Sequence, residues 1–133
     1  MNHPFSAPLL DCFSEIWYQN HTDHRCPHDG WIQELAITEP HSGARQEKRV
    51  TSIRIQILGA FHNGIIELTY SGVTRYLLKT TDVRKGHGDW LSDELVLNSD
   101  RRLVHRVKLD RGNWEFEAGT IDFKWTPFAN RSS

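Results

Sequence analysis

This chain has few cysteines and no excess of either charge. Its 133 residues include 2 cysteines, and 16 lysines and arginines are balanced by 17 aspartates and glutamates. Because no positive charge is left over to bind a phosphate backbone or an anionic lipid surface, we expect neither nucleic acid nor a membrane as a partner. Without a secretion signal, two thiols are usually reduced, so we favour free Cys12 and Cys26 over a disulfide.

Long apolar runs, a targeting segment and catalytic motifs are also missing. No stretch approaches the roughly 18 apolar residues that span a bilayer, and the opening sequence MNHPFSAPLLDCFSEIW lacks a basic n-region. We therefore expect a cytoplasmic protein. A length of 133 residues is typical of a single domain, so we expect one domain over residues 1–133. The chain contains no Ser-His-Asp motif, Gly-rich phosphate loop or dinucleotide fingerprint, so no cofactor is expected and an enzyme is the less favoured class.

What the chain does contain is a strong pattern of strands in its last third. From Leu91 to Trp125, apolar and polar residues alternate with the period of two that half-buried antiparallel strands show. We expect turns at Arg111-Gly112 and at Gly119-Thr120, because both pairs place glycine between alternating segments. The first turn would set Leu109 opposite Trp114.

Further strands are expected before this region. The segment GWIQELAIT, residues 30–38, is predicted to form one strand, followed by a solvent-exposed loop from Glu39 to Lys48. Ile53 to Ile57 alternates strongly. Asn63-Gly64 is the favoured two-residue hairpin signal, and Ser71-Gly72 allows another tight turn into the next strand.

One helix is expected near the N-terminus. Leu9, Phe13, Ile16 and Trp17 fall on a single stripe of a helix from about Pro8 to Asn20. Proline is well tolerated in the first turn of a helix, which favours this start.

These elements predict a mainly β, or α+β, domain. We expect seven to eight mostly antiparallel strands between about residues 30 and 125, arranged as a sandwich or a partly open barrel, with the helix on one face or closing one end. A two-layer arrangement of helix on sheet is the alternative. The predicted core comprises Phe13, Ile16, Trp17, Ile53, Ile55, Ile57, Leu68, Leu95, Val107, Phe116 and Phe123.

The densest group of metal-binding residue types lies between the helix and the first long strand. His21, His24, Cys26 and His28 crowd into a few positions, but no second pair of ligands has the spacing that a tetrahedral zinc site needs. A polar loop with solvated histidines is therefore favoured over a metal site. His105, in contrast, lies on an apolar strand face, where a backbone carbonyl or a tyrosine hydroxyl could satisfy the imidazole.

Two short segments resemble each other: HDGW at residues 28–31 and HGDW at residues 87–90. In the structural interpretation, each aspartate caps a turn and each tryptophan seals an edge of the core. In the functional one, His28, Asp29, His87 and Asp89 meet at one end of the sheet near His62, as a cluster for metal-assisted or acid/base hydrolysis.

With HDGWIQELAI, ILGAFHNGIIELTYSGV and GHGDWLSDELVL in view, the chain resembles small bacterial all-β proteins that carry HDxWI and HGDWLxDE motifs. The match covers roughly Phe13 to Trp125. Proteins of this kind are similar to the immunity proteins that accompany antibacterial toxins. The resemblance implies a protein-binding module that neutralises a cognate toxin by occlusion.

We expect partner contacts at the end of the sheet that carries both HDGW-like segments. The candidate residues are Asp29, Trp31, Lys85, His87, Asp89 and Trp90, because aromatic groups ringed by charge are typical of protein interfaces. The loop from Glu39 to Lys48 is expected to lie outside this surface. The alternatives are a small hydrolase that uses the His/Asp cluster and a ligand-binding barrel with an apolar cavity.

Overall fold

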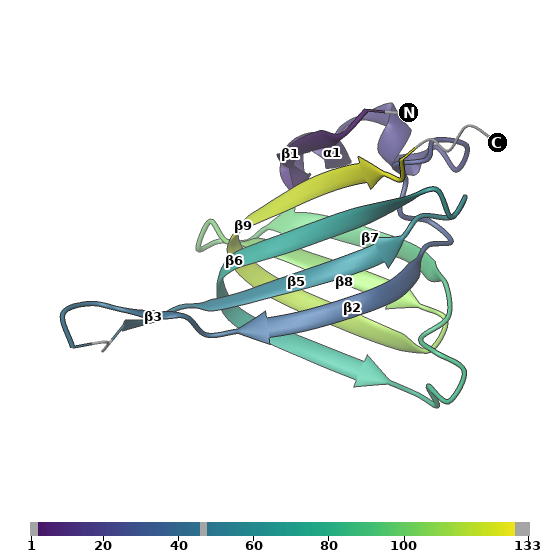
Figure 1. The fold of residues 1–133 in the computed structure, drawn as a ribbon. Coiled ribbons are helices and arrows are strands. Elements are labelled where there is room, and N and C mark those ends of the chain that lie inside the picture. Colours follow the sequence, from purple (N-terminus) through teal and green to yellow (C-terminus); the bar gives the residue numbers. More distant parts are fainter. Residues whose placement is uncertain (1–2, 46–47, 130–133) are drawn as a thin grey trace.

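A computed structural model describes residues 3–45 and 48–129, and almost all of their regular structure is antiparallel β (Figure 1). The helical elements are short: α1 (Leu9–Phe13) and the 3-10 turn η1 (Ile16–Gln19). The strands are β1 (Phe5–Pro8), β2 (Trp31–Thr38), β3 (His41–Ser42), β4 (Lys48–Arg49), β5 (Thr51–Leu58), β6 (Gly64–Thr80), β7 (Trp90–Leu97), β8 (Leu103–Leu109) and β9 (Gly112–Pro127).

Seven strands form one sheet in the order β2-β5-β6-β9-β8-β7, with β1 added to β9. Strands β6 and β9 are 17 and 16 residues long and pair with each other along almost their whole length. The first half of β6 pairs with β5 and the first half of β9 pairs with β8, so these two strands pass from one layer to the other. The prediction of a mainly antiparallel β fold, as a sandwich or an open barrel, is confirmed.

The sheet folds over at a bend where the sequence predicted two tight turns. Both Ser71-Gly72 and Gly119-Thr120 lie inside continuous strands, and Ser71 pairs directly with Thr120, so both turn predictions were wrong. Gly72 has φ of +62°, and the register shifts between Val73 and Arg75. A β-bulge uses the same glycine conformation as a turn but bends the strand without reversing it.

The hairpin between β8 and β9 has a different register from the predicted one. Leu109 pairs with Gly112, and Val107 pairs with Trp114, so the turn consists of Asp110 and Arg111. The predicted pairing of Leu109 with Trp114 was wrong. Because the difference is an even number of residues, each side chain still lies on its predicted face.

The core lies between the two layers, and most of its predicted members are buried. Ile16 is the clear exception, with 88% of its surface exposed. Buried as predicted are Ile53, Ile55, Ile57, Leu68, Val107, Phe116 and Phe123, whereas Phe13, Trp17 and Leu95 are partly buried.

The predicted helix from Pro8 to Asn20 is wrong in length. Strand β1 occupies the residues up to Pro8, and α1 ends at Phe13. Ser14 Oγ donates to the Asp11 carbonyl, and Glu15 is extended, with ψ of 144°. Serine competes with the helix for backbone groups in this way, so the stripe is divided between two short elements and Ile16 turns outward.

Two connections also differ from their predictions. The hairpin before β6 exists, but its loop is residues 60–63, closed by the Gly59 N–H and the Gly64 carbonyl at 3.0 Å, in place of a two-residue Asn63-Gly64 turn. Within the loop from Glu39 to Lys48, β3 pairs with β4 and forms an arm that extends from the body (Figure 1). Residues 46 and 47 of that loop lie outside the described residues.

Candidate binding surface at the loop end of the sheet

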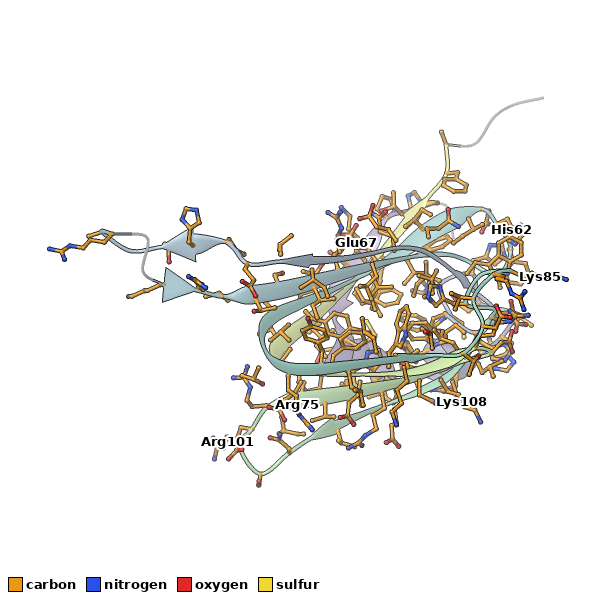
Figure 2. The ribbon with its side chains drawn as sticks, turned by 90° about the horizontal axis from the view of Figure 1, so that it is seen from below. His62, Glu67, Arg75, Lys85, Arg101 and Lys108 are labelled. Atoms are coloured by element: carbon orange, nitrogen blue, oxygen red, sulfur yellow. The ribbon has the colours of Figure 1, made fainter. Side chains whose placement is uncertain are left out.

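Four connections meet at the end of the sheet opposite the β3–β4 arm, and we call this region the loop end. They are residues 20–30, 60–63, 81–89 and 110–111 (Figure 1). Figure 2 shows His62 and Lys85, from two of these connections, at this same end.

Backbone hydrogen bonds join three of the connections. Asp29 N–H donates to the Trp90 carbonyl at 2.8 Å, Trp90 N–H donates to the Gly30 carbonyl at 3.0 Å, and Arg111 N–H donates to the His87 carbonyl at 3.0 Å. The two HDGW-like segments are therefore neighbours, although 58 positions separate Trp31 from Asp89. The sequence predicted that these two segments meet at one end of the sheet.

A cleft of about 380 Å³ lies between the start of β2 and the connection 81–89. Its lining is mostly polar or charged: Trp31, Ile32, Gln33, Lys85, Gly86, His87, Gly88, Asp89, Asp110 and Arg111. Four of the six candidate contact residues are among these.

Trp31 is the exposed aromatic group at the rim of the cleft. Its Nε1 donates to Asp89 Oδ1 at 3.1 Å, and the His62 ring packs edge-on against it at 4.6 Å. Asp89 N–H in turn donates to Asp110 Oδ2 at 2.7 Å. With 47% of its surface exposed, Trp31 is fixed in orientation and still available to a partner.

The remaining candidates divide into surface and core. Asp29 is exposed beside the cleft and adopts a positive φ of 66°. His87 is half-buried, with its ring edge-on to Trp114 at 5.2 Å. Trp90 has no exposed surface, so it supports the loop end from inside and cannot itself contact a partner.

Gly88 has a specific role in the shape of the cleft. Its φ is +80°, and a Cβ atom there would lie 2.3 Å from the Cβ of Asp110. Only glycine combines this backbone conformation with so close an approach, so residue 88 fixes how the connection 81–89 lies against the 110–111 turn.

The four metal candidates do not converge on a common point. The rings of His21 and His28 stack at 3.7 Å, His24 stacks on Phe61 at 4.2 Å, and Cys26 Sγ donates to the Tyr18 carbonyl at 3.0 Å. Among residues 3–45 and 48–129, no three His, Cys, Asp or Glu side chains are grouped as metal ligands.

The His/Asp cluster of the hydrolase alternative is likewise divided in its contacts. His28 Nδ1 lies 3.4 Å from Asp29 Oδ2, whereas His87 contacts Trp114 and Asp89 contacts Trp31. These contacts give the four residues no common centre at which a reacting atom could be held.

Arg25 links the histidine-containing connection to the N-terminal segment, through an ion pair with Asp23 inside the connection and a cation–π contact with Trp17. Asp23 accepts hydrogen bonds from Arg25, whose guanidinium lies 4.2 Å above the Trp17 ring. Burial alone would raise the pKa of Asp23, but the hydrogen bonds from Arg25 outweigh burial and hold that pKa below its ordinary value. The carboxylate therefore stays charged and keeps the connection in place.

Both cysteines are free and buried, as the composition predicted. Burial raises the pKa of the Cys12 thiol to about 11, with the Asp11 carboxylate adding to the effect, and burial also raises that of Cys26.

We predict that neither thiol reacts with a thiolate-selective reagent such as iodoacetamide in the folded protein at pH 8, and that both react after unfolding in urea. Mass spectrometry of the two samples measures this, and rapid labelling of the native protein would contradict it.

Four buried polar groups form a hydrogen-bonded network between the two layers, and the sequence analysis predicted only its His105 member. Tyr18 Oη donates to Asp93 Oδ2 at 2.6 Å, and His105 Nε2 lies 2.7 Å from the same oxygen. On the other side of the imidazole, Nδ1 lies 2.7 Å from Tyr70 Oη. Of the two partners that the sequence allowed for His105, a backbone carbonyl or a tyrosine hydroxyl, the structure shows the hydroxyl, that of Tyr70, and it adds Asp93 as a second partner.

The protonation of the groups in this polar network follows from their burial and their contacts. Burial raises the pKa of Tyr18 well above its ordinary value and the Asp93 carboxylate raises it further; the same two causes act on Tyr70. Both phenols therefore keep their protons and donate. In the neutral imidazole, His105 Nε2–H donates to Asp93 and Nδ1 accepts from Tyr70. Because His105 is fully buried, this polar network stabilises the fold and has no access to a substrate.

Comparison with known proteins adds no relationship: no protein-family model, curated protein or solved structure matches the chain. No helix in the described part of the chain is long and apolar enough to cross a membrane.

Proposed function

We propose that this chain is a protein-binding module that engages its partner with the loop end of the sheet. The observation that carries the proposal is Trp31, half-exposed at the rim of a charged cleft and held there by Asp89 and His62. A rigid aromatic side chain loses little conformational entropy on binding, and tryptophan is enriched among residues that dominate binding energy.

In line with its resemblance to bacterial immunity-type proteins, we propose that the partner is a cognate toxin. The chain would act in the cytoplasm and neutralise the toxin by covering its active surface. Lys85, Asp29 and Arg111 around Trp31 would then form the charged rim that sets specificity and orientation. Near-zero net charge supports recognition through such local groups in preference to attraction by the whole molecule.

The proposal predicts that replacing Lys85, His87 and Asp89 together by alanine weakens partner binding by at least about 2 kcal/mol, the threshold for dominant contacts. Isothermal titration calorimetry against the protein encoded by the adjacent reading frame measures this. The variant should stay folded and unfold at a slightly lower temperature, because Lys85 is exposed and the Asp89 carboxylate bonds to a half-exposed indole, whereas the His87 ring packs edge-on to Trp114.

A matched control replaces Lys48 and Arg49 on the exposed arm by alanine, and its affinity should equal that of the unmodified protein. Unaltered binding by the triple variant would move the interface away from the loop end. Loss of folding would instead assign Asp89 to holding Trp31 for the fold alone.

A further inference from the structure

The C-terminal half of β6 is a free strand edge. Residues 75–80 pair with β9 on one side, Thr74 lies at the register shift before them, and β5 pairs only with the part of β6 up to Val73. This half of the strand lies lowest in Figure 1, and Figure 2 views the molecule from that side, with Arg75 labelled. Free edges expose unpaired N–H and C=O groups that another strand can bond.

The other edges of the sheet each carry a feature that discourages strand addition. Strand β1 is four residues long and ends in Pro8. Strand β2 has an irregularity between Ile32 and Glu34, and Trp31 bridges to Asp89 at its start. Strand β7 has an irregularity after Trp90 and a buried, inward-facing Asp93. Bulges, proline, short length and inward charge are the common protections of edge strands.

Residues 75–80 have none of these four features, although Arg75 and Lys79 place positive charge on the outer face of this edge. They pair with β9 without a register shift and contain no proline. Tyr76 and Leu78, which pair with the buried Phe116 and Trp114, lie on the inner face, yet they are 44% and 36% exposed. The inner face of the sheet therefore ends at this edge with apolar side chains that nothing in the described chain covers, as it would if one more strand belonged there.

The opposite side of the molecule indicates what such an additional strand does. There the N-terminal segment adds β1 to β9, and Phe5 packs against Trp17 and Phe123 at 5.6 and 6.2 Å. Tyr18 of the same segment bonds Asp93 on β7. One side of the sheet is thus closed by a short strand with aromatic side chains, and the edge at residues 74–80 has no such cover.

The charges on this edge distinguish between occupants. Arg75 and Lys79 lie on the outer face on either side of Leu77. Arg75 already lies 3.4 Å from Glu115 and 3.7 Å from Glu117, whereas Lys79 forms no ion pair within the described residues, so Lys79 is the main cation available to an added strand. If a second copy paired antiparallel with all of residues 74–80, Arg75 would face Lys79 of the other copy, and like charges directly opposite are destabilising. A segment with acidic side chains at the outward positions would instead be favoured.

We propose that residues 74–80 accept an extended segment of the partner protein as an added antiparallel strand, with apolar side chains inward over Tyr76 and Leu78 and acidic side chains outward beside Arg75 and Lys79. The proposal rests on the protein-binding function above. Strand addition draws affinity from backbone hydrogen bonds and specificity from alternate side chains. Because Thr80 leads directly into the connection 81–89, the bound segment would continue to the cleft beside Trp31.

The test uses a synthetic peptide that alternates valine with glutamate and is long enough to pair with residues 74–80. In ¹⁵N-labelled protein, the amides of residues 74–80 should shift on titration, and every second amide, the ones that β9 leaves unbonded, should become protected from exchange. Leu78→Lys, which places a charge on the inner face, should weaken peptide binding by at least about tenfold. Leu97→Lys on β7, a matched change at an exposed leucine on another edge strand, should leave binding unchanged.

Several results would overturn the proposal. Equal peptide affinity in Leu78→Lys and the unmodified protein would do so, as would shifts confined to other strands. A dimer formed without peptide and abolished by Leu78→Lys would make a second copy the occupant. Equal affinity for a peptide with lysine in place of glutamate would remove the acidic assignment. If Leu78→Lys fails to fold, Tyr76→Lys, at a more exposed site, replaces it.

The failure of this proposal is distinguishable from failure of the proposed function. If the protein from the adjacent reading frame binds with equal affinity to Leu78→Lys and is weakened by the Lys85, His87 and Asp89 triple variant, the strand edge is excluded and the function stands. If the peptide binds at residues 74–80 but the adjacent protein does not bind at all, the edge is a strand acceptor and the proposed partner is wrong.

Discussion

Replacing Asp93 by alanine is expected to lower the free energy of unfolding by about 2–6 kcal/mol, because the change leaves two buried donors unsatisfied and each costs about 1–3 kcal/mol. The Asp93 side chain is 5% exposed, and its Oδ2 accepts from Tyr18 and from His105. Without it, a phenol and an imidazole are buried with unsatisfied donors. Urea unfolding, followed by tryptophan fluorescence, measures the shift in midpoint at constant slope.

A matched control comes from Asp82, whose carboxylate is exposed and bonds Arg84 two residues away. Its replacement by alanine should leave the unfolding midpoint unchanged, since an exposed local ion pair contributes little. If Asp93→Ala shifted the midpoint no more than this control, the network would make no net contribution to stability. A Tyr18→Phe variant should fall between the two, because it removes one bond and leaves the His105 contact intact.

The alternation of apolar and polar residues predicted the faces of the strands but not where the chain reverses. Leu68, Phe116 and Phe123 are buried as predicted, because a period of two fixes which side chains share a face. Ser71-Gly72 and Gly119-Thr120 became bends within β6 and β9 because the chance of a turn or a bulge depends on pairing with a distant strand. Local sequence contains no information about that pairing.

The buried network shows a signal that sequence reasoning could have used. Asp93 shares the inner face of β7 with Leu95, and His105 shares the inner face of β8 with Val107. Two polar residues on the apolar faces of adjacent strands are expected to satisfy each other, because burying either alone is costly. Tyr18, 75 residues before Asp93, could not be found in this way, since only the packing of the N-terminal segment brings it there.

The sequence predicted that the two HDGW-like segments meet, but not how their side chains divide between surface and core. The sequence placed Asp29 and Asp89 at one end of the sheet, and backbone bonds join their segments there. It did not distinguish the two tryptophans of the HDGW-like segments, of which Trp31 is 47% exposed and Trp90 is fully buried. The pairing register shifts soon after each tryptophan, between Ile32 and Glu34 in β2 and between Trp90 and Ser92 in β7, so the alternation of the rest of each strand does not extend to the ring.

Trp125 supports the loop end from within the core, and its replacement by alanine is expected to cost about 3–5 kcal/mol of stability. The residue has no exposed surface, and Gly59 and Gly64 lie against its ring: a Cβ on Gly59 would lie 3.3 Å from Cζ3, and one on Gly64 only 2.3 Å from Cη2. Glycine at position 64 is thus required by the indole and not by a positive φ. Thermal and urea unfolding of Trp125→Ala measure the loss.

The same contact predicts a coupling between Gly64 and Trp125 that a general loss of packing would not produce. Gly64→Ala alone should destabilise the protein by roughly 1–3 kcal/mol, because the added methyl overlaps the indole. In a Trp125→Phe background the ring is smaller, so adding Gly64→Ala should cost distinctly less than it does alone. A double-mutant cycle on the unfolding free energies gives the coupling directly. Strict additivity of the two changes would show that the close approach of Trp125 is not the reason for glycine at position 64.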